Sequence, residues 1–113
     1  MAFDEALAQR LRDGLARVKG VSEKRMMGGL CVLVNGNMLG GVDRAKDGSD
    51  RFMFRVGKDN ETEALARPGA TIVDMGGKRL GGLVFVAADA CDDKALKAWL
   101  SLSLGFVGQL PRK

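Results

Sequence analysis

The sequence predicts an α+β fold of the order α-β3-α-β2-α, in which helices flank a largely antiparallel five-stranded sheet. Three observations lead to this prediction. Apolar residues recur with helical spacing over residues 3–18 and again after Asp92. The segments between them are short apolar runs bounded by turn residues, which is typical of strands. Helices and strands do not alternate one for one, so a doubly wound parallel fold is disfavoured.

The first helix is expected over residues 3–18. Its apolar stripe consists of Phe3, Leu7, Leu11, Leu15 and Val18. Asp4 and Glu5 come early, where carboxylates favour the positive end of the helix dipole. Gly20 is suited to the left-handed conformation that ends many helices.

Three strands are expected next, near residues 24–34, 37–42 and 51–56. Asn35-Gly36 joins the first two and suits a type I′ hairpin, because both central residues of that turn need positive φ. A short helix over residues 60–66 follows and is stopped by Pro68-Gly69.

Two further strands are centred on residues 71–73 and 83–86, with a glycine-rich turn at Gly76-Gly77 between them. The final helix is expected over residues 92–108, with Asp92 as its N-cap. Because no linker or repeat interrupts the pattern, residues 1–113 are expected to form one domain.

The strand expected over residues 24–34 is apolar on both faces. One face carries Met26, Leu30, Val32 and Val34, and the other carries Met27, Cys31 and Leu33. A strand with one face in water should instead alternate with polar residues. Either helices cover both sides of the sheet, or one side meets another subunit. We favour the second explanation, which predicts a homodimer with Met27, Cys31 and Leu33 at or near its interface.

The composition argues against enzymatic activity. The chain has no His and no Tyr, which excludes His-based general base catalysis and Ser-His or Cys-His nucleophiles. Cys31 and Cys91 are too few and too far apart in sequence for structural zinc, which needs about four ligands. We therefore expect two inert thiols, no metal and no cofactor.

The polar connection over residues 43–50 could hold a metal ion through Asp43, Asp47 and Asp50. These carboxylates lack the spacing of an EF-hand loop. We favour a solvated acidic loop balanced by its neighbouring basic residues.

The basic residues are candidate contacts for an anion or a partner. The net charge is +4, but the 18 bases are interspersed with 14 acids. The candidate contacts are Lys24, Arg25, Arg55, Lys78 and Arg79. Arg55 lies in an apolar strand, so it either faces solvent, which we favour, or pairs with a buried acid. In principle its guanidinium could bind a carboxylate or phosphate with two hydrogen bonds. The six aromatic residues are expected in the core rather than on a base-stacking surface.

Several motifs together resemble the TfoX N-terminal-domain family. They include Arg25-Met26-Met27-Gly28-Gly29, Asn35-Gly36-Asn37-Met38, Phe54-Arg55-Val56-Gly57 and Gly81-Gly82-Leu83-Val84-Phe85-Val86. Family members often carry Phe where Met27 stands. The resemblance implies a secretion-chaperone-like fold, a bacterial setting and a link to the regulation of competence for DNA transformation. It implies no catalytic residues.

The function expected from the sequence is that of a non-enzymatic, homodimeric interaction module with an unknown protein partner, linked to transcriptional or competence regulation. The alternative is direct nucleic-acid binding through the mildly basic surface. No apolar run approaches the roughly 20 residues of a membrane span. The acids near the N-terminus do not fit a signal peptide, so a cytoplasmic location without membrane contact is expected.

Overall fold

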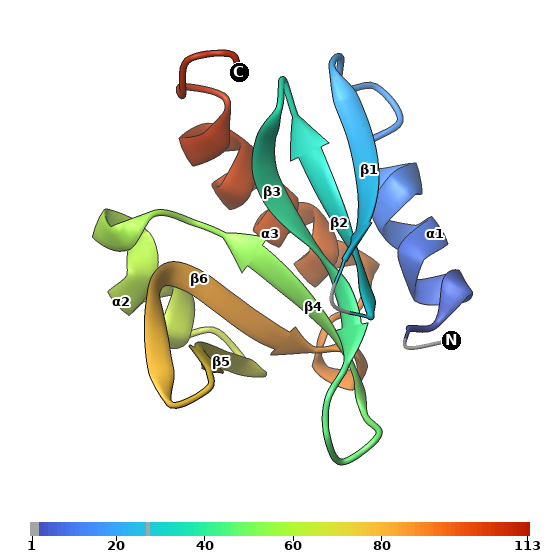
Figure 1. The fold of residues 1–113 in the computed structure, drawn as a ribbon, viewed down its shortest axis with the longest axis vertical. Helices are drawn as coiled ribbons and strands as arrows, with labels where there is room; N and C mark the ends of the chain where they lie inside the picture. The colour runs from blue at the N-terminus through green and yellow to red at the C-terminus, as the bar shows by residue number, and fades with distance from the viewer. Residues whose placement is uncertain (1–2, 27) are drawn as a thin grey trace.

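The computed structural model describes residues 3–26 and 28–113. Its elements follow the order α1 (Glu5–Gly14), β1 (Val21–Met26), β2 (Gly29–Val34), β3 (Asn37–Arg44), β4 (Asp50–Arg55), the 3₁₀ turn η1 (Lys58–Asn60), α2 (Glu61–Leu65), β5 (Ala70–Met75), β6 (Lys78–Ala87), the 3₁₀ turn η2 (Ala88–Ala90) and α3 (Asp93–Val107) (Figure 1). The predicted α+β class with an antiparallel sheet is confirmed.

The described part of the chain forms a six-stranded sheet of order β1-β2-β3-β4-β6-β5, so the prediction of five strands was wrong. The segment predicted as one strand over residues 24–34 is two strands, β1 and β2, which pair with Met26 opposite Gly29. Gly28, in the connection between them, has a φ of 77°, a conformation that glycine adopts without steric cost. The unbroken apolar character of this segment hid the reversal of the chain.

The first helix is shorter than predicted and spans Glu5–Gly14 rather than residues 3–18. Asp4 caps its start by accepting a hydrogen bond from the Ala6 amide at 2.9 Å. The last residue of the helix lies against α3, since a Cβ built on Gly14 would be 2.5 Å from Cδ1 of Leu100. Glycine is also a weak helix former, which favours termination there.

Most other boundaries lie close to their predictions, but β6 begins at Lys78 rather than near Leu83. Asn35 and Gly36 have φ values of 53° and 82°, as the predicted type I′ turn requires. Gly76 and Gly77 have positive φ in the turn between β5 and β6. The Asp92 carboxylate caps α3 by accepting from the Ala95 amide at 2.8 Å.

The last residues of the chain lie against the turn between β2 and β3. The side-chain amide of Asn37 donates to the carbonyl oxygen of Pro111 at 2.9 Å. The Lys113 amide donates to the carbonyl oxygen of Asn35 at 2.9 Å. Asn37 is 2% exposed, so this bond satisfies a polar side chain that is buried from water.

The hydrophobic core lies between one face of the sheet and the helices α1 and α3. In Figure 1, α3 passes behind the sheet and α1 lies beside β1. Residues of β2 that alternate towards this face, such as Val32, belong to the core. Trp99 of α3 is 2% exposed and stacks on Phe54 of β4, with ring centroids 5.4 Å apart and an angle of 3° between the planes. One of the two central strands, β4, is thereby fixed to the longest helix of the described chain.

Replacing Trp99 by alanine should lower the free energy of unfolding by about 3–5 kcal/mol, because it empties a packed site at the centre of the core. Chemical denaturation followed by far-UV circular dichroism measures the change. Ser101→Ala, on the exposed side of α3, is the matched control and should change stability by less than about 0.5 kcal/mol. An unchanged midpoint for Trp99→Ala would contradict its role as core anchor.

Candidate functional site

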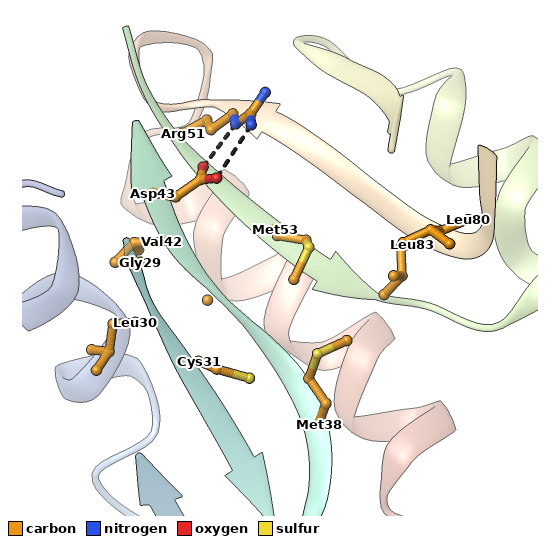
Figure 2. A pocket seen from close by; sticks show the side chains of 11 residues that line it. Gly29, Leu30, Cys31, Met38, Val42, Asp43, Arg51, Met53, Leu80 and Leu83 are labelled. Carbon is orange, nitrogen blue, oxygen red and sulfur yellow. Dashed lines mark hydrogen bonds and ion pairs between the residues drawn. The ribbon is translucent and has the colours of Figure 1, made fainter. Parts of the chain in front are cut away.

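The sheet face turned away from α1 and α3 carries an apolar groove with a volume of about 480 Å³ (Figure 2). We call it the sheet groove. Its main apolar side chains are Cys31, Met38, Met53, Leu80 and Leu83, from β2, β3, β4 and β6. Most of these side chains are half-buried rather than covered by another element.

The strand register explains why this face is hollow. Gly41 of β3 lies between Cys31 of β2 and Met53 of β4 in neighbouring pairs of the sheet. It contributes no side chain, so the groove floor there is backbone. A Cβ on Gly41 would lie 2.1 Å from the carbonyl oxygen of Leu30, closer than the packed strands allow. The groove therefore depends on this glycine.

One end of the groove is closed by an ion pair. Asp43 accepts two hydrogen bonds from Arg51, from Nε at 2.7 Å and from Nη2 at 3.2 Å (Figure 2). The Arg51 guanidinium carbon also lies 3.5 Å from the ring centroid of Phe85, which is 6% exposed. The groove end is thus polar but internally neutralised, which leaves apolar contact as the main chemistry that the groove offers.

The two cysteines are free and buried. Burial raises the pKa of the Cys31 thiol, and nearby Lys24 opposes this effect more weakly. Burial also raises the pKa of Cys91 to about 11. Both thiols are therefore protonated near neutral pH, as expected of unreactive cysteines.

Two of the three predicted interface residues, Cys31 and Leu33, lie on the same face of β2. Cys31 lines the sheet groove, and Leu33 is half-buried and alternates to the same side of β2. Met27 lies outside the described residues.

The predicted basic contacts do not form one patch. Lys24 and Arg25 lie on β1 and Lys78 and Arg79 begin β6, whose turn leads to β5 at the opposite edge of the sheet. Arg79 forms a salt bridge with Glu61. Arg55 stands apart, at the end of β4.

Arg55 faces a second cavity of about 550 Å³, which we call the end pocket. Lys58 of η1, and Phe106 and Gln109 at the end of α3, also line it. Phe106 was predicted as a core residue, but it is only half-buried and part of its ring borders this cavity. Gly57, Gly82 and Gly105 line the pocket too, and no sequence pattern marked them as part of a site.

The acidic loop predicted over residues 43–50 is exposed in its middle, over residues 46–49. Asp43 on β3 and Asp50 on β4 are half-buried. Its carboxylates have separate partners rather than a common centre: Asp43 binds Arg51, Asp50 binds Arg44 at 3.0 Å, and Asp47 accepts from Ser49. Within residues 3–26 and 28–113, no group of three His, Cys, Asp or Glu residues is arranged to hold a metal ion.

Glu61 ties η1 and α2 to the sheet. One carboxylate oxygen accepts from the Gly82 amide at 2.6 Å, and the other pairs with Arg79. Its side chain is 15% exposed. The hydrogen bond from Gly82, followed by the pairing with Arg79, lowers the pKa of Glu61 below its ordinary value.

Comparison with known proteins agrees with this architecture. The family model described as the TfoX N-terminal domain matches residues 13–107. No curated protein matches the chain significantly. A crystal structure of a protein from Pseudomonas syringae, a structural-genomics target, is similar with a TM-score of 0.62 over 88% of this chain and 97% of the other. At 9% sequence identity, this likeness concerns the fold alone. Among the described residues, no helix has the length and apolar character to cross a bilayer.

Glu61→Gln should destabilise the protein near neutral pH and have progressively less effect in acid. Because the folded-state pKa of Glu61 is lowered, its contribution is present above the unfolded-state value of about 4.5 and is lost as the pH falls through the folded-state value. The measurement is the difference in melting temperature between wild type and variant from pH 7 to pH 3. A constant difference across this range would contradict the assignment.

The control is Glu63→Gln, which removes a carboxylate from the same helix without breaking a bond to the sheet. Glu63 pairs with Arg67, four residues further along the chain, and its side chain is 62% exposed. Its removal should therefore change the melting temperature less than that of Glu61 near pH 7.

Proposed function

The chain belongs to the TfoX N-terminal domain family, and from this premise we propose that it is a non-enzymatic interaction module that pairs with a second copy of itself through the sheet groove. The observation that carries the proposal is the asymmetry of the sheet. Its two long helices cover one face, and the other face keeps an apolar groove. Removing apolar surface from water lowers the free energy by about 25 cal/mol per Å².

A two-fold pair is the simplest arrangement that covers such a face, because the same surface is used on both copies. The groove is compatible with burial in this way. Its charged end residues, Asp43 and Arg51, already satisfy each other through two hydrogen bonds. Pairing would therefore not bury an unmatched charge, which would cost several kcal/mol.

The family supplies the biological setting of the proposal. We place the paired module in the regulation of transcription or of competence for DNA transformation, where it would present a composite surface to a protein partner. The alternative is direct binding of nucleic acid. The distribution of basic residues favours it less, since Lys24 lies on the edge strand β1 and Lys78 lies on β6, four strands away in the sheet.

Met53→Lys should shift the protein from dimer to monomer, because it places a charge from each copy in the groove. Sedimentation equilibrium at micromolar concentration should give about twice the 12.1 kDa chain mass for wild type and about one chain mass for the variant. Ile72→Lys is the control and should stay dimeric. It adds the same charge on β5, where Ile72 is 43% exposed and does not line the groove.

A wild-type protein that remains monomeric over the accessible concentrations would refute the pairing. Binding of duplex DNA with a steep dependence on salt would instead favour the alternative, because phosphate contacts release counterions. Circular dichroism of Met53→Lys confirms that the variant is folded before its mass is interpreted.

A further inference from the structure

The end pocket begins where two strands of the sheet separate. β3 and β4 pair from Arg44 opposite Asp50 as far as Gly40 opposite Phe54. Beyond this point the strands are no longer paired, and Arg55 lies at the end of β4 (Figure 1). Its guanidinium carbon is 5.6 Å from the ring centroid of Phe106, on α3. The side chain is thus held between a strand end and a helix end.

Arg55 differs from the other half-buried arginines of the described chain. Those residues, Arg10, Arg12, Arg51 and Arg67, each form a salt bridge with a carboxylate. Arg55 forms none with any described residue. Within residues 3–26 and 28–113 it donates one hydrogen bond, from Nη1 to the Met38 carbonyl oxygen, which is 3.5 Å long and therefore weak. A guanidinium has five N–H donors, so most of its hydrogen-bonding capacity is unused.

Glu61, an acid on the neighbouring helix α2, is already engaged. Glu61 accepts from the Gly82 amide and pairs with Arg79. Two cations, Arg55 and Lys58, line the end pocket with a single acid, Asp59. Neither Arg55 nor Lys58 forms a salt bridge within the described residues, so the pocket carries an excess of positive charge.

The walls of the pocket are fixed by backbone contacts. The Gly82 carbonyl oxygen accepts from the amides of Val56 at 2.9 Å and of Gly57 at 3.2 Å. Gly57 has a φ of 86°, and a Cβ there would lie 2.5 Å from the Phe106 ring. The pocket is therefore formed before any ligand arrives, which lowers the entropy cost of binding.

Gly105 leaves the helical side of the pocket open. It lies within α3, where glycine is less favourable than alanine by roughly 0.5–1 kcal/mol. A Cβ built on it would meet no atom within 4 Å, so packing does not explain the glycine. Its effect is to keep free volume beside Phe106 and Gln109.

From these observations we infer that the end pocket binds the oxyanion of a small phosphorylated or carboxylated molecule. The Arg55 guanidinium holds two oxygens of the anion with parallel hydrogen bonds, a geometry common to carboxylates and phosphates. Lys58 adds a second positive charge, and the Gln109 amide can donate a further hydrogen bond. The inference goes beyond the proposed pairing and does not depend on it, because none of these residues lines the sheet groove.

The test is a titration of the ¹⁵N-labelled protein at constant ionic strength, with three separate probes: inorganic phosphate, adenosine monophosphate and succinate. Saturable shifts of the amide signals of Gly57, Lys58 and Gly82 are expected with at least one probe. Response to phosphate probes alone would identify a phosphorylated ligand, and response to succinate alone a carboxylated one. Arg55→Gln should weaken binding about tenfold or more, since it removes the bidentate contact. Lys78→Gln, outside the pocket, should change it less than about twofold.

A steric variant separates occupancy of the pocket from loss of charge. Gly105→Leu should fold, because its side chain enters open space, and it should abolish the saturable shifts while Arg55 is intact. Gly105→Ala, the matched control, should retain them. The inference is overturned if no probe gives saturable shifts at the pocket, or if Arg55→Gln or Gly105→Leu binds as wild type does.

Discussion

The fold depends on the contact between Phe54 and Trp99. It joins β4, which lies between β3 and β6, to α3, which packs on the core. Gly40 pairs with Phe54 at a position that has no room for a side chain, since a Cβ there would lie 2.1 Å from the Met53 carbonyl oxygen. The two aromatic rings therefore occupy one side of the sheet without competition. Because α1 packs on the same side, both long helices cover one face of the sheet. Neither covers the opposite face, where the sheet groove lies.

The local elements could be predicted from the sequence because their causes are local. Asp92 caps α3 through a bond to an amide three residues away, and Asn35-Gly36 turns the chain through its own backbone preferences. The family, too, could be recognised from short motifs. The number of strands could not be predicted, since residues 24–34 have the same apolar character on both sides of the reversal near Gly28. The end of α1 at Gly14 was missed because the apolar stripe continues to Leu15 and Val18, which pack on the core although they lie beyond the helix.

The two candidate sites also differ in whether local sequence reveals them. Alternation along one strand could assign Cys31 to the sheet face opposite the core, and the structure places it in the sheet groove on that face. The end pocket could not be found from the sequence. It requires β3 and β4 to separate beyond Phe54 and the end of α3 to lie beside Arg55. From the sequence, Phe106 is one more member of an apolar helical stripe, and nothing shows that part of its ring is left uncovered.

The bonds between the chain end and the turn joining β2 to β3 have a consequence for the order of folding. The turn itself closes between neighbouring residues, whereas the bond from Asn37 to Pro111 spans 74 residues. Contacts between distant residues carry a larger loop-closure entropy than local ones. We therefore expect the hairpin to form early and the tail to dock late. The same tail would then be the first segment to detach, and hydrogen exchange would report it as an opening distinct from global unfolding.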